Sequence, residues 1–420
     1  MNFKLKIIPY VVALAMTSIT AIAAEDSDAP SVDPEFEKIV IVSATRRAEN
    51  VQSVPISLTV VDGDYMARSG INNLKDLSTH VPNFNMSNSS QVTNTRLIIR
   101  GVGSVGNTAV EGSVGVFIDG VYYPRPGSVI GNLLDISAVE VLRGPQGTLF
   151  GRNTPMGALN ITTNDPTDDF RANTHVSYGN YNDLNIGTTI SGGLSDTIYG
   201  LASVNYTDRD GYGYNELTSK EIGDTEDLTF RGKLLFDISD SVEAKLTVDL
   251  AEVNHTGAIV ELLPETNSPL FIGTTQALYG VPAGSGDDPY DNVVNQVNDD
   301  KATDEQWGVT AQFKFDIADY ELKSITAIRN WENDYQDESS LRIAADLVPR
   351  NSFYSNGTFS QEFQILSPEG DTFDYVAGLF YYEENFDVDT FFDAGSDYCS
   401  PTVFGIVRGQ LIASGMDPAT

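Results

Sequence analysis

A glycine-rich segment is the first part of the sequence whose residue types could do chemistry. Gly101, Gly103 and Gly106 match the pattern G-x-G-x-x-G after an apolar run, and Asp119 stands near the spacing of a ribose-binding acid. A dinucleotide site would also need a helix directly afterwards, because the helix N-terminus holds the pyrophosphate. The segment after Gly106 is rich in Asn, Thr and Gly and disfavours a helix. We therefore interpret the glycines as a flexible loop.

The other reactive residue types form no recognisable constellation. The three histidines, His80, His175 and His255, have no metal-ligand spacing, and no Ser/His/Asp set stands out. The paired acids Glu383 and Glu384 are expected to be solvated. We expect no catalytic residue, no metal site, no cofactor and no enzyme activity.

The net charge of the chain is −34, which argues against a nucleic-acid partner, since phosphates need Lys and Arg. The acidic residues are interpreted as solvated loops, with divalent-cation binding as the alternative.

The N-terminus has the features of a secretory signal peptide over residues 1–23. Lys4 and Lys6 precede a short apolar stretch, and Ala21-Ile22-Ala23 fits a cleavage site. The chain is thus expected to be exported, yet its single Cys399 excludes a disulfide scaffold. One explanation for this lone thiol is a partner that lies beyond Thr420.

Two short segments follow the signal peptide. Residues 24–36 are acidic, contain two prolines and predict a disordered leader. The next segment is β-prone and consists of Glu37, Lys38, Ile39, Val40, Ile41, Val42, Ser43 and Ala44. It fits either a strand that adds to the sheet of a partner or the first strand of the following domain. The residue pattern alone leaves both open.

Residues 50–165 predict a compact mixed domain, with short apolar strands separated by Gly and Pro turns and a short helix at Leu74 to Leu77. From residue 171 the pattern changes to long alternating strands. Residues 228–238, 242–250 and 307–317 alternate apolar and polar side chains over about 9–11 residues, enough for a tilted strand to cross a membrane. Aromatic residues near strand ends suit an interfacial girdle.

Short and long connections alternate along this second part. Short turns are expected at 195–196, 239–241, 318–319 and 367–371, and long polar stretches at 210–227, 254–303 and 336–354. This pattern favours an up-and-down transmembrane barrel over a soluble β-sandwich, the alternative for alternating strands. About nine strands are expected within residues 171–420. An open sheet edge cannot face lipid, so the sequence is expected to be incomplete.

The ordered motifs between residues 37 and about 165 resemble those of TonB-dependent outer-membrane receptors. They are residues 37–44 followed by Thr45-Arg46-Arg47, Val54-Pro55-Ile56-Ser57, residues 74–82, Ile99-Arg100-Gly101, residues 116–122 (VFIDGVY) and residues 139–153 (VEVLRGPQGTLFGRN). The barrel part agrees in pattern but carries few motifs.

The resemblance implies a β fold with an α+β plug: a transmembrane antiparallel β-barrel of 22 strands, occluded by the plug domain of residues 50–165. Residues 37–47 would be the TonB box region, and TonB with its inner-membrane energising complex the partner. The chain would lie in the lipid of a Gram-negative outer membrane and import a scarce nutrient, foremost a ferric siderophore. Alternatives are a carbohydrate or other organic nutrient, and, in another class, a passive porin or adhesin.

The resemblance also indicates site residues. Tyr122, Tyr123 and Arg125 are expected to reach the plug apex and bind the ligand. Arg100 and Arg143 match the plug arginines that pair with barrel glutamates in the family, and Glu362 is the expected partner. The alternative is that both arginines satisfy buried carbonyls of the plug.

Overall fold

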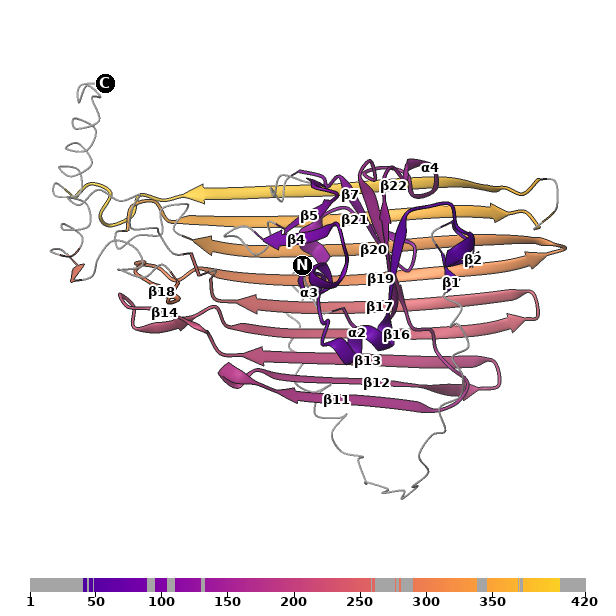
Figure 1. The fold of residues 1–420 in the computed structure, drawn as a ribbon, viewed down its shortest axis with the longest axis horizontal. Helices are drawn as coiled ribbons and strands as arrows, with labels where there is room; N and C mark the ends of the chain where they lie inside the picture. Colours follow the sequence, from indigo (N-terminus) through magenta and orange to yellow (C-terminus); the bar gives the residue numbers. More distant parts are fainter. Residues whose placement is uncertain are drawn as a thin grey trace, which may run out of the picture. The chain divides into compact units, whose positions relative to one another are not determined.

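The computed structural model describes residues 41–43, 45–47, 49–88, 95–103, 110–129, 133–257, 259–260, 276, 279–280, 290–337, 346–368, 370 and 373–400. The described residues from Ile41 onward form one compact unit (Figure 1). The expected signal peptide, the leader, residues 37–40, Ala44 and most of the Gly106 loop lie outside the described residues.

The N-terminal domain is built on a five-stranded sheet with the order β3-β9-β10-β7-β8. Strand β10 runs parallel to β7, and the remaining neighbours are antiparallel. The strands are β3 (Leu58–Asp62), β7 (Val114–Ile118), β8 (Val121–Tyr123), β9 (Ile136–Arg143) and β10 (Gly157–Thr163). A three-stranded sheet of β4 (Phe84–Asn88), β5 (Thr95–Ile99) and β6 (Val102–Gly103) and a ribbon of β1 (Ile41–Val42) with β2 (Glu49–Asn50) complete its strands.

Local capping sets the helices of this domain. The Asp62 side chain accepts hydrogen bonds from the first backbone N–H groups of α2 (Gly63–Ser69), and Gly70 ends the helix at φ 66°. The Asn73 side chain caps α3 (Leu74–His80) in the same way. The expected helix at Leu74 to Leu77 is therefore present and one turn longer. The four-residue α4 is Gly147–Phe150.

Two motifs of the sequence form tight hairpin turns. Arg100-Gly101 joins β5 to β6, and Asp119-Gly120 joins β7 to β8. All four residues have positive φ, between 48° and 83°, as a two-residue type I′ turn requires. The turn at Asp119-Gly120 fixes the position of a carboxylate at the edge of the domain.

Apolar side chains of the N-terminal domain form two core clusters, and the smaller one lies around Phe117 and Phe150. The larger cluster includes Leu74, Leu77, Val139, Val141, Leu159 and Ile161. Ala327 from the second part of the chain belongs to the same cluster, and Ile325 packs against it. The two parts of the chain therefore share an apolar contact.

Residues 171–392 form a nine-stranded antiparallel sheet in which strands pair in chain order. The strands are β11 (Arg171–Tyr178), β12 (Leu184–Ser195), β13 (Ile198–Arg209), β16 (Thr225–Ser239), β17 (Val242–His255), β19 (Lys301–Ile317), β20 (Tyr320–Asp337), β21 (Arg350–Leu366) and β22 (Val376–Phe392). Short 3-10 turns lie at η1 (Val51–Ser53), η2 (Pro126–Val129) and η3 (Asn180–Asn182). The expected number of strands is confirmed for the described residues.

The alternation of connection lengths is also present. Two residues join β12 to β13, β16 to β17 and β19 to β20. At the opposite ends of the strands, long segments join β13 to β16, β17 to β19 and β20 to β21 (Figure 1). The strands themselves are longer than expected, up to 18 residues in β20. The alternating stretches of sequence covered only the apolar part of each strand. Polar residues continue the backbone pairing on either side of that part. A small sheet of β14 (Gly213–Asn215), β15 (Lys220–Ile222) and β18 (Val293–Val294) lies in the long connections.

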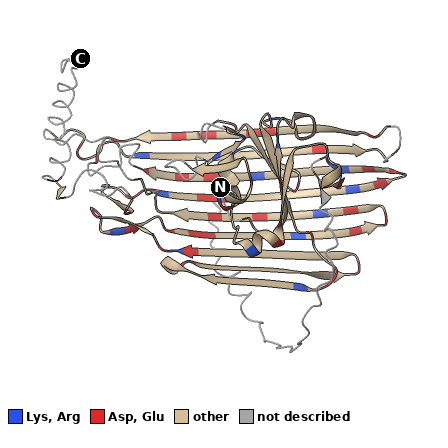
Figure 2. Ribbon diagram, in the orientation of Figure 1, with Lys and Arg blue, Asp and Glu red and all other residues tan. Residues whose placement is uncertain are grey.

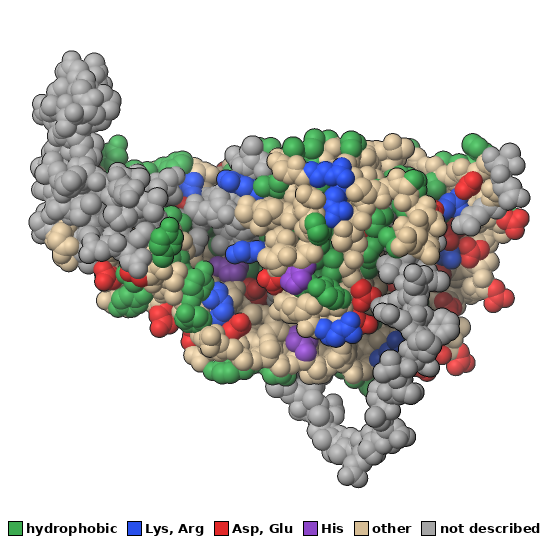
Figure 3. All heavy atoms as spheres, in the orientation of Figure 1, with side chains coloured by type: hydrophobic (Ala, Val, Ile, Leu, Met, Phe, Trp, Pro, Cys, Tyr) green, Lys and Arg blue, Asp and Glu red, His purple; other side chains and the backbone are tan. Residues whose placement is uncertain are grey.

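The two faces of the nine-stranded sheet differ in chemistry. Along β19, Asp304 and Thr310 are buried, while Trp307, Val309 and Phe313 on the opposite face are exposed. Charged residues occur along the whole length of the strands (Figure 2), and acidic side chains gather at the short-turn end, on the right of Figure 3. In β20 both faces are apolar locally, because Ile325 packs against the N-terminal domain while Ile328 is exposed.

None of the helices in the described ranges combines the length and apolar character that crossing a membrane requires; this finding concerns helices only.

Candidate functional site

The polar face of the nine-stranded sheet meets the N-terminal domain through a series of charged contacts. They divide into two groups. One lies near the middle of strands β16 to β22, and the other lies where the chain enters the N-terminal domain at Ser43 to Arg47.

Arg125 makes a deeply buried cross-domain ion pair in the first group. It follows β8, and its Nε and Nη2 donate to Glu384 Oε1 on β22 at 2.9 and 2.8 Å. The same oxygen accepts from Asn356 Nδ2 at 2.6 Å, and the guanidinium lies 4.0 Å from the centre of the Phe386 ring. The exposed fractions of the Arg125 and Glu384 side chains are only 6% and 11%. Burial on this scale makes the loss of either partner costly.

Asp119 forms a second buried pair, with Lys233 of β16. Lys233 Nζ lies 3.2 Å from Asp119 Oδ2, and its side chain is fully buried. Thr163 donates its backbone N–H and its hydroxyl to the same carboxylate. Burial raises the pKa of Asp119, but the charges of Lys233 and Arg231 and the Thr163 hydrogen bonds outweigh it, so the pKa lies below its ordinary value. Asp119 is therefore ionised at neutral pH.

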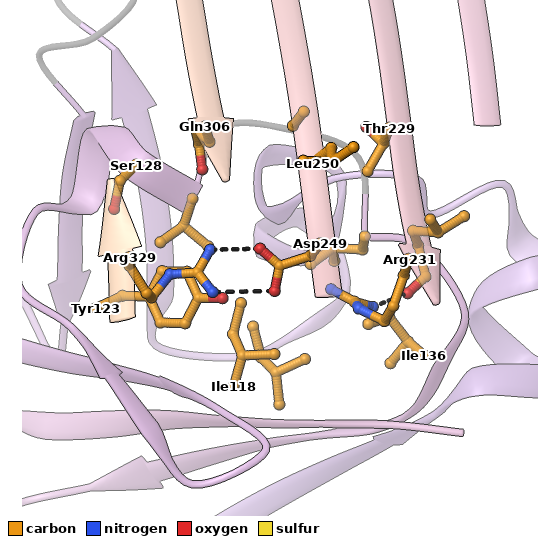
Figure 4. A pocket seen from close by; sticks show the side chains of 15 residues that line it. Ile118, Tyr123, Ser128, Ile136, Thr229, Arg231, Asp249, Leu250, Gln306 and Arg329 are labelled. Carbon is orange, nitrogen blue, oxygen red and sulfur yellow. Dashed lines mark hydrogen bonds and ion pairs between the residues drawn. The ribbon is translucent and has the colours of Figure 1, made fainter. Parts of the chain in front are cut away.

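Arg329 and Asp249 form a bidentate pair on the polar face itself, at 3.0 and 2.8 Å (Figure 4). The Arg329 guanidinium lies 4.1 Å from the centre of the Tyr123 ring, and Arg231 Nη1 donates to Leu134 O at 2.6 Å. These side chains border a small cavity of about 50 Å³. The contacts of Arg329 with the Tyr123 ring and of Arg231 with the Leu134 carbonyl therefore position the N-terminal domain on the sheet.

The second group holds the segment from Ser43 to Arg47. Ser43 donates its backbone N–H to Glu140 Oε1 of β9 at 2.7 Å. Arg47 Nη2 donates to Ser367 O and Tyr375 O at 2.8 and 3.1 Å, beside the short connection between β21 and β22. Thus the chain enters the N-terminal domain at the short-turn end of the sheet.

Arg46 lies between these two anchors. Its Nε donates to Leu149 O at 3.1 Å, and its guanidinium lies 4.8 Å from the centre of the Phe150 ring. Arg46 Nη2 is 3.7 Å from Glu362 Oε1, too far for a hydrogen bond. The backbone of Arg46 has φ 68°, which costs a non-glycine residue about 1–2 kcal/mol.

The residues expected to bind ligand are buried in these contacts. Tyr122, Tyr123 and Arg125 are each 5–6% exposed. The Tyr122 hydroxyl accepts from Asn153 Nδ2 at 2.7 Å, and burial raises the pKa of Tyr122 to about 12. Burial also raises the pKa of Tyr123, so both phenols stay protonated at neutral pH.

The expected set of Arg100, Arg143 and Glu362 is not brought together. Arg100 donates to Ser57 Oγ, and Arg143 to Thr59 Oγ1 and Pro82 O, all within the N-terminal domain. Glu362 faces Arg46 instead. Burial and the nearby charge of Arg100 lower the pKa of Arg143.

Sequence reasoning missed Lys233, Asp249, Arg329 and Glu384 as contact residues, and the expectation that Glu384 is solvated was wrong. A usable signal existed: each is a charged residue at an inward position of an alternating strand. Which plug residue each would meet could not be derived from strand patterns. Among the described residues, no three His, Cys, Asp or Glu side chains are placed to hold a metal ion.

Comparisons with known proteins agree with this architecture. Residues 50–158 match the TonB-dependent Receptor Plug Domain. The chain is 27% identical over 219 residues to the pesticin receptor of Yersinia pestis, covering 51% of this chain and 32% of that protein. It is 28% identical over 153 residues to the catecholate siderophore receptor Fiu of Escherichia coli, covering 36% of this chain and 17% of that protein.

The fold is also that of solved receptors. The ferric yersiniabactin uptake receptor FyuA from Yersinia pestis superposes with a TM-score of 0.68 at 21% identity, covering 81% of this chain and 50% of that one. The chain spans about a third or less of the length of the relatives named above. The N-terminal domain thus matches the plug domain of TonB-dependent receptors, and together with the nine-stranded sheet it has the fold of part of such a receptor.

Proposed function

We propose that this chain works as an active-transport receptor that takes up a ferric siderophore with energy supplied through TonB. One observation carries the proposal: the plug sits against the polar face of the barrel sheet through buried ion pairs, and its entry segment is anchored at the short-turn end. A plug held in this way needs an external force to move it. The entry segment at the short-turn end of the sheet is a place where that force could act.

The segment of residues 37–44 is proposed as the point where TonB binds by strand addition. Ile41 and Val42 already pair as a strand with Glu49 and Asn50, so the described end of this segment is extended backbone. Within the same segment, Ser43 is hydrogen-bonded to Glu140 on β9 of the plug sheet. A pull on the segment would therefore act on the plug sheet itself.

Siderophore is the favoured ligand because the named relatives are a catecholate siderophore receptor and the pesticin receptor, and the superposed structure is a ferric yersiniabactin receptor. A carbohydrate or other organic nutrient is the alternative within the same class. Tyr122, Tyr123 and Arg125 would meet the ligand only after the contacts that bury them have opened. We further propose that the chain has no enzyme activity.

Arg100 and Arg143 are proposed as arginines that lock the plug. Their side chains lie near each other, and within the described residues Arg143 Nε is buried without a hydrogen-bond partner. Two neighbouring guanidinium groups would be stabilised by carboxylates. Replacing Arg143 with Ala should abolish uptake while surface binding of the siderophore persists. Normal uptake by Arg143→Ala would remove this residue from the lock.

The proposed function is tested by uptake of radioactive ferric siderophores in cells that rely on this receptor. Ile39→Pro should block strand addition, because proline cannot donate to the ladder. Cells with this variant should bind siderophore at the surface but import none. Ser31→Pro, in the leader, is the matched control and should import normally.

A passive porin or adhesin is the alternative from a different class. A passive pore would let solute through equally well in Ile39→Pro cells and in cells treated with a protonophore. Uptake that depends on neither residue 39 nor the proton gradient would therefore contradict the proposal. Uptake of a sugar in place of iron chelates, with the same dependence, would favour the organic-nutrient alternative.

A further inference from the structure

A small cavity lies beside the pair of Asp249 and Arg329, between the plug and the barrel sheet (Figure 4). Its volume of about 50 Å³ has room for several water-sized particles, because one water molecule needs about 10–15 Å³. Apolar side chains form a large part of its lining: Ile118, Val129, Leu133, Ile136, Ile161 and Leu250. Neither the proposed binding of TonB nor the proposed lock makes use of this space.

The charged side chains that line this cavity are two arginines and one aspartate, namely Arg231, Arg329 and Asp249. Arg329 binds both carboxylate oxygens of Asp249, at 3.0 and 2.8 Å, so these two charges offset each other. In Figure 4 the Asp249 carboxylate turns toward Arg329, and Arg231 lies on its other side. Arg231 donates instead to a neutral group, the carbonyl oxygen of Leu134, at 2.6 Å. The lining therefore carries a surplus of positive charge.

Arg231 is only 7% exposed, and within the part of the chain that the structure describes it forms no ion pair. Two further carboxylates act on it electrostatically, those of Asp119 and Asp135, but neither lines the cavity. Asp119 is paired with Lys233 at 3.2 Å. Asp135 accepts a hydrogen bond from Asn164 at 2.9 Å. Because a buried charge without a close partner of opposite sign is costly, the Arg231 guanidinium favours an added anion.

Thr229 supplies a second polar group at the same cavity. It stands two residues before Arg231 on β16, so both side chains leave the same face of the sheet. Thr229 is 7% exposed, and its hydroxyl oxygen is buried without a hydrogen-bond partner among the described residues. A hydroxyl group can donate a hydrogen bond to an anion. One positive charge and one donor on the same strand thus face a space of small volume.

We propose that this cavity binds one small monovalent anion, chloride, between the Arg231 guanidinium and the Thr229 hydroxyl. Chloride is close to a water molecule in size and fits the space. Phosphate and sulfate are larger and carry more charge, so moving them into a mostly apolar lining costs more. The bound ion neutralises an arginine that reaches from β16 to the Leu134 carbonyl of the plug, and it thereby strengthens the contact between plug and sheet. The inference is independent of the proposed transport of a siderophore.

Thermal unfolding of the purified receptor, expressed as its gene encodes it, tests the proposal. At equal ionic strength, chloride and bromide should raise the unfolding midpoint by about 2–4 °C relative to gluconate, which is too large for the cavity. Thr229→Val removes the donor at nearly constant volume and should abolish this difference. Thr247→Val is the matched control, because Thr247 is also 7% exposed on the inward face of β17 but does not line the cavity, and it should keep the difference.

Two outcomes of this measurement would overturn the proposal. Equal midpoints of the unsubstituted receptor in the three salts would show that no halide binds. A halide effect that persists in Thr229→Val would show a general effect of the salt instead of a site.

Anomalous X-ray scattering from receptor crystals grown in bromide locates the ion without any variant. A bromide peak is expected beside Arg231 and Thr229, and Arg231→Gln should remove it. A cavity that holds only water in the bromide crystals would overturn the proposal. Neither readout involves uptake, so a failure of the proposed function is recognised separately.

Discussion

Near the middle of the barrel strands the plug is held by buried ion pairs. At the short-turn end its entry segment is held by hydrogen bonds to Glu140 and to carbonyl groups and by one loose pair. Arg125 and Glu384 are almost fully buried and hydrogen-bonded. Arg46 and Glu362 are 3.7 Å apart without a hydrogen bond. The strength of the contacts is therefore graded along the interface. The segment proposed to receive the force can separate first, while the central pairs still hold the plug in place.

The largest effect is expected from breaking the central group. Glu384→Ala leaves Arg125 buried without its carboxylate, which should destabilise the plug and barrel contact by about 3–5 kcal/mol. The measurement is thermal unfolding in detergent together with protease cleavage within residues 50–158. Glu383→Ala is the control, because Glu383 is exposed on the opposite face. If the two variants were equally stable, the Arg125 contact would not hold the plug.

A smaller and pH-dependent effect is expected at Asp119. Its pKa lies below the ordinary value, so the ionised form is favoured by folding, and its contribution is present above about pH 4 and lost as the pH falls further. Asp119→Asn should lower stability at pH 7 by about 1–3 kcal/mol and flatten the acid limb of the stability profile. Asp196→Asn, on an exposed turn, should leave that profile as it is. An unchanged acid limb in Asp119→Asn would contradict the assignment.

The smallest effect on stability is expected at the entry segment. Arg46→Gln removes a loose pair, the hydrogen bond to Leu149 O and a ring contact. It should lower the free energy of unfolding by about 0.5–1.5 kcal/mol, measured by thermal unfolding in detergent. A loss of stability as large as that of Glu384→Ala would contradict the graded interface.

The fold could be predicted from sequence because each part of it depends on local signals. Alternation along residues 242–250 gives the face of a strand, and the pair Asp119-Gly120 gives a hairpin turn. The interface could not be predicted in the same way. Arg125 was assigned to ligand and Glu384 to solvent, because the register between plug and barrel is set by tertiary packing across 259 residues of chain. For the same reason the sequence could not indicate that Glu362 lies beside Arg46.

Ile325 and Ala327 are apolar side chains on the inward face of β20, and they pack with the core of the plug. An apolar contact carries no charge that water or ions could screen, so it persists when neighbouring ion pairs separate. It gives the plug a pivot on one side of the lumen. A force on the entry segment would then rotate the plug about β20 instead of pulling it away from the sheet. The plug would return to its resting position without refolding.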